Sequence, residues 1–249
     1  MVNRRELEAY LQELLGVERW KDYGPNGVQV EGQDEISRLA VGVTASRAFI
    51  EAALAQGAQA LLVHHGLFWR GYEGRITGWM KQRIAPLIHA DATLLAYHLP
   101  LDAHPEFGNN AALAAELGWT AQGQFGEQQL GCWGVLPEAQ SLAGVVERVQ
   151  ARLGRACTAV AGDGRPIRKV AWCTGGAQSY FEGAIAAGAD LYLTGEISEP
   201  QAHYARETGV AYIAAGHHAT ERYGVQALGR HLSGRFGLTC TFIDIDNPA

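Results

Sequence analysis

Residues 39–66 read LAVGVTASRAFIEAALAQGAQALLVHHG, and this stretch decides the fold class. LAVGVT predicts a short strand, SRAFIEAALAQG a helix capped by Ser46, and AQALLVHHG a second, buried strand. A strand, a helix and a second strand in this order form the unit from which parallel sheets are built. We therefore expect an α/β protein.

A second copy of this unit occupies residues 169–196, KVAWCTGGAQSYFEGAIAAGADLYLTGE. In both copies the first strand leads to a threonine and the helix ends at a glycine. Two copies of this length predict two related α/β lobes, because a solenoid needs shorter and more numerous repeats. The matched positions are Val41–Thr44 with Ala171–Thr174, Gly57 with Gly188, His98 with His217, and Asp102 with Glu221.

The segment between the copies, residues 118–168, breaks the repeat. It combines loop and strand material with LAGVVERVQARLG, which predicts an amphipathic helix. We therefore predict a first lobe over residues 1–117, a small inserted α+β subdomain over 118–168, and a second lobe over 169–249. Ligands of open α/β sheets bind beyond the carboxyl ends of the strands, so the two lobes are expected to form a metal-binding cleft there.

Composition excludes several classes of protein. With 249 residues, 47% of them hydrophobic and 18% charged, the chain is long enough to bury a sizeable core. No apolar run has the ~20 residues of a membrane span, and the N-terminal stretch lacks the apolar region of a signal peptide, so the cytoplasm is expected. The four cysteines form no CxxC pair, which argues against a disulfide framework or a zinc-thiolate site. A net charge of −6 disfavours general binding to nucleic acid.

Two histidine pairs carry the candidate chemistry: His64 and His65 end one apolar run, and His217 and His218 end another. Neutral imidazole is the commonest side-chain metal ligand, so two such pairs suggest a polynuclear metal site. A single core histidine is usually only hydrogen-bonded, and His89, His203 and His231, which fall inside helix patterns, are interpreted as structural or exposed. The predicted ligands are His64, His65, Asp102, His217 and Glu221.

The spacing of these residues supports a shared site. His217 and Glu221 stand four residues apart at a helix start and share a face. His64 and His65 can converge if the strand ends at Gly66, and Asp102 is expected at a third strand end. Three imidazoles and two carboxylates suit two divalent ions such as Zn²⁺, Mn²⁺ or Fe²⁺.

His98 and His218 are predicted to take part in catalysis as proton carriers, because imidazole titrates near neutral pH. His98 matches His217 in the repeat and should face the site, either as a ligand or as a substrate contact. The segment FWRGYEGRITGWMKQR (68–83) interleaves aromatic and basic side chains that could stack on a base and meet phosphates. It could equally be a solvated loop or a subunit contact. Its aromatic and basic residues are Trp69, Tyr72, Trp79, Arg70, Arg75, Lys81 and Arg83.

Several of these motifs together resemble one known family. YGPNGVQVEG, GVTAS, LLVHHGLFW, LLAYHLPLDAHPEFGNN, AWCTGGAQ, TGE and AAGHHATER are similar, in order and spacing, to the GTP cyclohydrolase 1 type 2 homologues, also called the Ngg-interacting-factor-three-like family. The resemblance runs from Asp22 to the C-terminal FIDIDNP. It implies a two-metal centre on the same five ligand positions and a ring-shaped homohexamer with the sites facing an internal cavity.

The resemblance leaves function open between two classes. One is a metal-dependent hydrolase acting on a nucleotide-like or phosphorylated small molecule, in which a metal-activated water attacks carbon or phosphorus. The other is a non-catalytic metal-loaded ring that binds nucleic acid or a protein partner. A role in metal storage agrees less well with the ligand pattern, because ligands drawn from several strand ends suit a site that retains its ion and does not release it. We expect the hydrolase.

Overall fold

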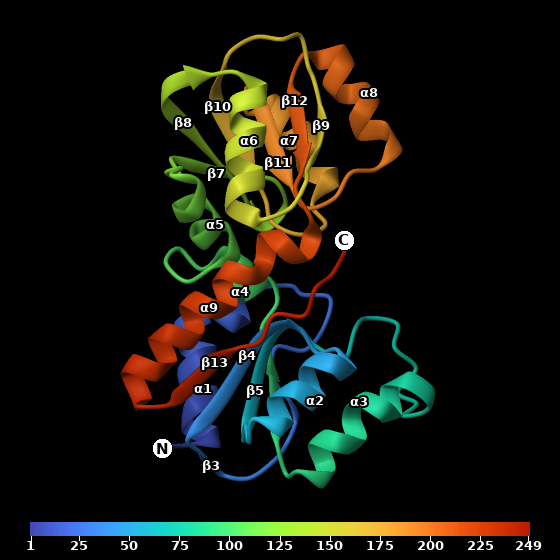
Figure 1. Cartoon of the computed structure of the whole chain (residues 1–249), viewed down its shortest axis with the longest axis vertical. Coiled ribbons are helices and arrows are strands. Elements are labelled where there is room, and N and C mark those ends of the chain that lie inside the picture. The colour runs from blue at the N-terminus through green and yellow to red at the C-terminus, as the bar shows by residue number, and fades with distance from the viewer. The chain divides into compact units, whose positions relative to one another are not determined.

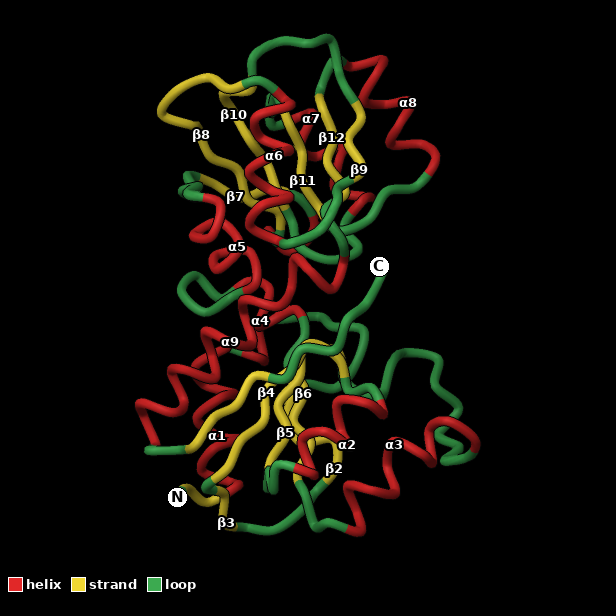
Figure 2. The backbone as a smooth tube through the Cα atoms, viewed as in Figure 1, coloured by secondary structure: helices red, strands yellow, loops and turns green.

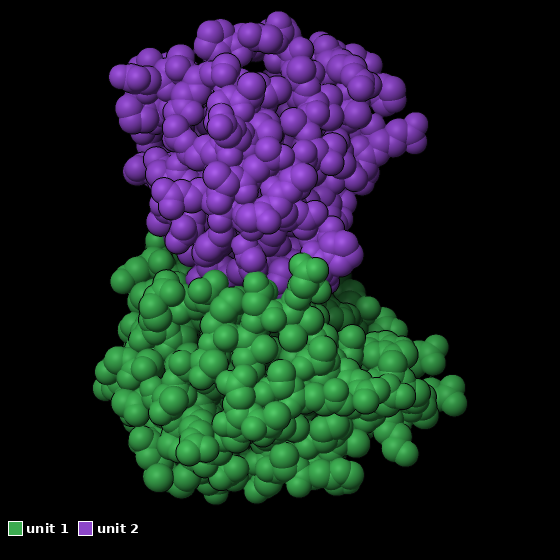
Figure 3. Space-filling view, in the orientation of Figure 1, with its two compact units in different colours: residues 1–108, 224–246 green, residues 109–223, 247–249 purple.

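A computed structural model describes all residues, 1–249, as a mixed α/β protein. The chain forms two compact units, coloured separately in Figure 3. Unit 1 comprises residues 1–108 and 224–246, and unit 2 comprises residues 109–223 and 247–249. None of the helices is long and apolar enough to cross a membrane.

Unit 1 is built on a five-stranded sheet in the order β13-β4-β5-β6-β2 (Figure 2). The first four strands are parallel and β2 runs antiparallel beside β6. A small separate sheet pairs β1 with β3. The strands are β1 (Val2–Asn3), β2 (Gly27–Val30), β3 (Glu35–Ile36), β4 (Arg38–Thr44), β5 (Ala60–His65), β6 (Thr93–Ala96) and β13 (Thr239–Phe242).

Both faces of this sheet are buried, as parallel sheets require. Side chains alternate along β4: Leu39, Val41 and Val43 pack with helix α1 (Arg4–Leu15) and the later part of α9 (His217–Phe236). Ala40 lies in the other core, with helices α2 (Arg47–Ala55) and α3 (Gly78–His89). The remaining helices of unit 1 are η1 (Val17–Arg19) and α4 (Leu99–Ala103).

Local signals in the sequence fix where these helices begin and end. The Ser46 side chain accepts a hydrogen bond from the backbone N–H of Phe49 and caps α2, as predicted. Asn3 caps α1 in the same way, and that helix ends at Gly16 in the left-handed conformation that glycine adopts without strain. The strand, helix and parallel strand predicted over residues 39–66 are therefore present as β4, α2 and β5.

Unit 2 is built on a six-stranded sheet in the order β7-β8-β10-β11-β12-β9. The three central strands β10, β11 and β12 are parallel (Figure 1). β8 runs antiparallel beside β10, β9 antiparallel beside β12, and β7 antiparallel beside β8. The strands are β7 (Gly123–Phe125), β8 (Gly131–Gln140), β9 (Thr158–Val160), β10 (Ile167–Trp172), β11 (Leu191–Thr194) and β12 (Ala211–Ala214). The helices are α5 (Asn109–Leu117), η2 (Glu127–Gln129), α6 (Leu142–Leu153), η3 (Gln178–Tyr180), α7 (Phe181–Ala186), α8 (Glu199–Thr208) and the start of α9.

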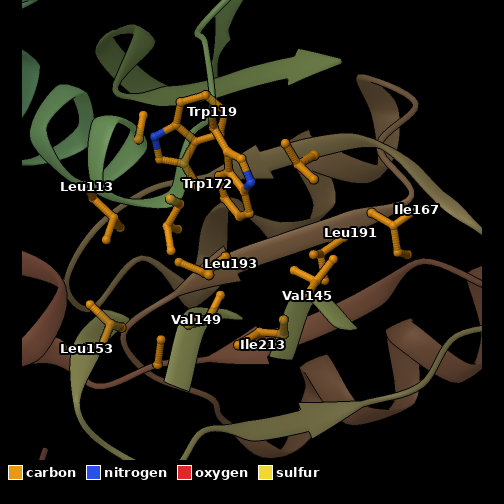
Figure 4. Close-up of a cluster of buried hydrophobic side chains, with 14 of the residues drawn as sticks. Leu113, Trp119, Val145, Val149, Leu153, Ile167, Trp172, Leu191, Leu193 and Ile213 are labelled. Carbon is orange, nitrogen blue, oxygen red and sulfur yellow. The ribbon is translucent and has the colours of Figure 1, made fainter. Parts of the chain in front are cut away.

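One face of the unit 2 sheet packs against α5 and α6 (Figure 4). Trp172 is fully buried there, and its indole N–H donates to the backbone oxygen of Asn110 at 3.1 Å. The opposite face carries an aromatic cluster of Phe181, Tyr192 and Tyr212, whose ring centroids lie 4.9–5.8 Å apart.

The structure divides the chain differently from the predicted segments. Residues 118–168 supply the strands β7, β8 and β9 to the sheet of unit 2, because β8 pairs with β10 and β9 pairs with β12. They also supply the helix α6 to its core. The last strand, β13, returns to unit 1, where it pairs with β4. Asp102 also differs from expectation: it lies in the short helix α4, because Pro100 in the first turn starts a helix after β6 ends at Ala96.

Candidate metal centre

Unit 1 places His64 and His65 at the carboxyl end of β5. His64 is fully buried, and its Nδ1 donates to the backbone oxygen of Tyr97 at 3.0 Å. A donating Nδ1 leaves the lone pair on Nε2, and that atom lies 3.4 Å from Oδ1 of Asp102. Asp102 is buried in α4, so an imidazole and a carboxylate from separate elements meet here.

The His65 ring lies beside the His64 ring, with centroids 4.6 Å apart. Its Nδ1 is 3.1 Å from the hydroxyl of Thr44, which ends the neighbouring strand β4. The two adjacent histidines therefore converge, as predicted, although β5 extends through His65.

His98, which precedes α4, belongs to the same group of side chains. Its ring lies 5.0 Å from that of His64 and 5.8 Å from that of His65. Its Nδ1 lies 2.7 Å from Oδ1 of Asp22, and its backbone N–H donates to the Asn26 side chain at 2.7 Å. Asp22 and Asn26 were not among the residues predicted for the site, although Asn26 lies in the motif YGPNGVQVEG and Asp22 directly precedes it.

The Asp22 carboxylate is fixed by several hydrogen bonds besides its contact with His98. It accepts from the backbone N–H groups of Tyr23 and Leu99 and from the Asn26 amide, at 2.6–2.9 Å. Burial by itself would raise the pKa of Asp22, but the hydrogen bond and charge of His98 and these further donors keep the pKa below its usual value. Asp22 is therefore an ionised carboxylate with a fixed orientation toward His98.

Aromatic and basic side chains border this group. Trp69 meets the His98 ring edge-on at 5.0 Å, and the Tyr23 ring lies 6.2 Å from it. Both aromatic side chains are substantially exposed, and the Arg70 guanidinium lies 5.5 Å from the centre of the Tyr23 ring. From the predicted segment 68–83, Trp69 and Arg70 therefore lie beside the histidines, whereas Trp79 stands exposed on α3 under the Arg83 guanidinium.

Unit 2 places His217 and Glu221 one turn apart at the start of α9. His217 Nε2 lies 3.3 Å from Oε2 of Glu221, and its Nδ1 lies 2.6 Å from Oε1 of Glu196. Glu221 is buried, whereas Glu196 is partly exposed and follows β11. Tyr212 fixes the backbone at Glu196 by donating its hydroxyl to the Glu196 carbonyl oxygen at 2.6 Å.

Glu196 was also missed in the sequence analysis, yet a signal for it exists. The repeat that matches Gly57 with Gly188 also matches His65 with Glu196. The carboxyl end of β11 therefore carries a polar side chain at the position that corresponds to His65.

A glycine loop lets the chain approach these carboxylates closely. Gly175 has φ +71°, and a Cβ atom there would overlap the Glu221 carboxylate. Its backbone N–H donates to the Thr220 hydroxyl at 3.0 Å, and its carbonyl accepts from the Thr194 hydroxyl at 3.0 Å. Only glycine fits this position without strain.

The charges around His217 determine how it titrates. Burial by itself would lower the pKa of His217, but the hydrogen bonds and negative charges of Glu221 and Glu196 outweigh burial and raise the pKa to about 9. A divalent cation would neutralise the same carboxylates, and it would require His217 in the neutral form.

The other histidines lie outside these groups or at their margin. His218 is half-buried next to His217. His89 is exposed at the end of α3, and His203 lies within α8. His231 pairs with the hydroxyl of Tyr10 at 2.5 Å, which agrees with a structural role.

The donor set fits a divalent metal ion. Imidazole nitrogens and carboxylate oxygens are ligands of zinc, manganese and iron, and the Nδ1 atoms of His64, His65, His98 and His217 all contact protein oxygens. Metal-bound histidines almost always use their second nitrogen in this way, which fixes the ring and its tautomer. Residues of both units could thus hold metal ions.

Comparison with known proteins gives the family. A sequence model of the Duf34/NIF3 (NGG1p interacting factor 3) family matches residues 2–248. The chain belongs to the Duf34/NIF3 family. It is 50% identical to the GTP cyclohydrolase 1 type 2 homolog of Neisseria meningitidis serogroup A over 249 residues, covering 100% of both chains. It is 46% identical to the protein of the same name from Escherichia coli K12 over 246 residues, or 98% of each chain.

Solved structures of similar sequence have the same fold as this Duf34/NIF3 chain. One is the protein ybgI, described as of unknown function, with a TM-score of 0.96, 44% identity and 100% of both chains covered. Another is TTHA1606 from Thermus thermophilus, with a TM-score of 0.91, 34% identity and 100% of both chains covered. The family and fold expected from the resemblance are therefore confirmed.

Proposed function

We propose that this Duf34/NIF3 chain is a metal-dependent hydrolase that acts on a nucleotide-like or phosphorylated small molecule. The observation that carries the proposal is that each unit presents a histidine whose Nδ1 is held by a carboxylate, beside further imidazole or carboxylate donors. Such a carboxylate–histidine arrangement orients a metal ligand and raises its basicity. The proposed ligands of two divalent ions are His64, His65, Asp102, His217 and Glu221.

Zinc, manganese and iron all suit three imidazoles and two carboxylates. Divalent ions in such a site lower the pKa of a bound water and stabilise negative charge on a substrate oxygen. Glu221 is buried and has two carboxylate oxygens, which suits it to bridge the ions. Asp102 and Glu221 correspond in the repeat, so each unit supplies a proposed carboxylate ligand from the same position of its lobe.

Proton transfer needs a side chain near the ligands that titrates near neutral pH. His218 keeps this role in our proposal, because it is half-buried and follows the proposed ligand His217 directly. His98 keeps this role as well, because its ring lies 5.0 Å from that of His64 and 5.8 Å from that of His65.

The substrate class is supported by the surroundings of the histidines in unit 1. Tyr23 and Trp69 offer exposed aromatic surface beside His98, and the guanidinium of Arg70 lies at the same place. Aromatic rings stack on planar bases, and a guanidinium pairs with phosphate oxygens. A phosphorylated compound with a planar ring could stack on the aromatic side chains and pair its phosphate with the guanidinium.

The homohexameric ring implied by the family also remains a proposal. Light scattering coupled to size-exclusion chromatography tests it, because one chain has a mass of 26.8 kDa and a hexamer would have six times that mass. A monomer or dimer at micromolar concentration would contradict it.

Elemental analysis joined to a hydrolysis screen tests the function. Purified protein should contain about two divalent ions per chain, as in two-metal hydrolases, and release phosphate or formate from a nucleotide when those ions are supplied. His64→Ala and Glu221→Ala should lose metal and turnover together, whereas His89→Ala, which removes an exposed histidine, should keep both. Metal without turnover of any nucleotide would favour the non-catalytic ring, and absence of metal would refute the proposal.

A further inference from the structure

We propose that Arg155 binds a phosphate group of the substrate, and that residues 247–249, the tail, occupy Arg155 when no phosphate is bound. Arg155 and the tail both belong to unit 2. The inference deepens the proposed function and rests on it, because it places the phosphate of a phosphorylated small molecule near His217. Arg155 is an anion-binding residue in addition to Arg70, which borders the histidines of unit 1.

The position of Arg155 is the first support. Its guanidinium lies against the backbone of Gly216, the residue that precedes His217 and α9. Gly216 has φ +100°, and a Cβ atom there would overlap the guanidinium. Glycine therefore leaves the space that the Arg155 side chain fills, and it adopts this backbone conformation without strain. A positive charge is thus held next to the first residue of α9.

The hydrogen bonds of Arg155 are the second support. Its Nη1 donates to the backbone oxygen of Ala249 and its Nη2 donates to that of Pro248, both at 2.9 Å. The Asn247 side chain shapes the tail by accepting from the Ala249 N–H at 3.0 Å. A guanidinium that presents two nitrogens to a pair of oxygens is the arrangement in which arginine binds phosphate. The two carbonyl oxygens therefore take the places of two phosphate oxygens.

The charge of Arg155 is the third support. No aspartate or glutamate side chain pairs with it, and its hydrogen bonds go to the neutral backbone of the tail. Arg165 of the same unit differs, because its guanidinium lies 2.9 Å from the Asp163 carboxylate. A guanidinium without a carboxylate partner retains its attraction for an anion from solution.

The tail is held in a way that permits its displacement. Residues 247–249 are exposed, and none of them belongs to a hydrophobic core. Their carbonyl oxygens are neutral, whereas a phosphate brings negative charge to the same two hydrogen bonds and strengthens them. Phosphate and the tail therefore compete for Arg155, and the tail lowers the apparent affinity of the chain for phosphate.

Isothermal titration calorimetry of the full chain with inorganic phosphate, at constant ionic strength, tests the inference. Arg155→Ala should weaken phosphate binding about tenfold or more, because a hydrogen-bonded charge is lost. A variant that lacks residues 247–249 should bind phosphate about threefold more tightly or better, because the competitor is gone. The two changes combined should bind as weakly as Arg155→Ala alone. Arg152→Ala removes an exposed arginine of α6 and is the matched control.

Carboxypeptidase digestion gives a second readout, because it follows the tail directly. Inorganic phosphate should speed the release of Ala249 from the wild-type chain. Arg155→Ala should release Ala249 at the faster rate even without phosphate, since its tail is no longer held. Arg155→Gln is included in case Arg155→Ala does not fold, and thermal melting of each variant is the check.

Equal phosphate affinity in the wild-type chain and Arg155→Ala would overturn the inference, and so would an affinity that removal of the tail leaves unchanged. Metal content and nucleotide hydrolysis, measured on the same variants, separate this inference from the proposed function. Hydrolysis with the same kcat and KM after Arg155→Ala would overturn the inference and leave the proposed function standing. Phosphate binding that depends on Arg155, in a chain without metal or turnover, would support the anion site and refute the proposed function.

Discussion

The Oε1 atom of Glu196 lies 2.6 Å from Nδ1 of His217. His98, the residue that corresponds to His217 in the repeat, has the same kind of contact with Asp22 at 2.7 Å. The two carboxylates come from unrelated places in the chain, one after β11 and the other in the turn before β2. The arrangement of the histidines is therefore repeated, whereas the source of the supporting carboxylate is not.

Glu196→Gln should weaken metal binding without removing a ligand. The neutral amide oxygen accepts the His217 N–H more weakly than a carboxylate does, and loss of such a partner typically costs about 10- to 100-fold in affinity. Titration with a competing chelator measures this change. Glu207→Gln alters an exposed glutamate of α8 and serves as control. Equal losses in the two variants would contradict the role of Glu196.

The stability of the metal-free protein should fall between about pH 6.5 and about pH 9. The pKa of His217 is raised to about 9 in the folded chain, so the imidazolium favours the folded state. This contribution is complete below the unfolded pKa of about 6.5, and it is lost as the pH rises through the folded pKa. Urea unfolding in the presence of a chelator, at several pH values, measures it.

The His217→Gln variant is the control for this pH dependence. It should lose the decline in stability over that interval, because glutamine does not titrate. A decline of the same size in the variant would assign the effect to other groups. Zn²⁺ affinity of the wild-type chain should rise over the same interval, because the ion competes with the proton for His217.

Gly175→Ala should damage the unit 2 metal site more than it damages the fold. Gly175 and Gly188 have nearly the same left-handed backbone, with φ of +71° and +73°. Alanine at either position should cost about 1 kcal/mol of stability for that backbone. At Gly175 the added Cβ would also displace Glu221, whereas at Gly188 no heavy atom lies within 4 Å.

Metal content and unfolding free energy, measured for both glycine variants, separate the two effects. We expect both variants to be similarly destabilised at the backbone and only Gly175→Ala to lose metal. Full metal content in Gly175→Ala would show that Glu221 is not required at its observed position.

The thiols of Cys132 and Cys240 should react slowly in the folded protein. Burial raises the pKa of both Cys132 and Cys240 to about 11, so almost no thiolate exists near pH 7.5. Labelling with a disulfide reagent should therefore be slow in buffer, and all four free cysteines should react at once in guanidinium chloride. Fast labelling of Cys132 or Cys240 under native conditions would contradict the burial of these two thiols.

The elements that the sequence predicted are those with strong local signals. The β4–α2–β5 unit has a capping serine, a helix-ending glycine and two apolar runs, and each of these acts within a few residues. The helix predicted over LAGVVERVQARLG is present as α6 for the same reason. Asp102 was predicted at a strand end, whereas Pro100 starts the short helix α4 there.

Contacts between distant residues could not be predicted in this way. Asp22 is 76 residues from His98 in the sequence, and no periodicity connects the two. The pairing of β13 with β4 likewise depends on tertiary packing, because TCTF alone indicates a strand but not its neighbour. For Glu196 a signal was present, since the repeat matches it with His65, but carboxylates near strand ends are common and the match alone does not assign a role.

The discontinuity of unit 1 has a consequence for the synthesis of the protein. Its sheet needs β13 at one edge, and one of its cores needs Val225, Leu228 and Leu232 from α9, all of which follow unit 2 in the sequence. A chain emerging from the ribosome therefore carries an unpaired β4 edge and an uncovered apolar face until α9 and β13 have been made. Unit 2 is nearly continuous and is translated before those residues, so it can fold first. Unit 1, whose first residues are translated first, therefore needs protection from aggregation for longer than unit 2.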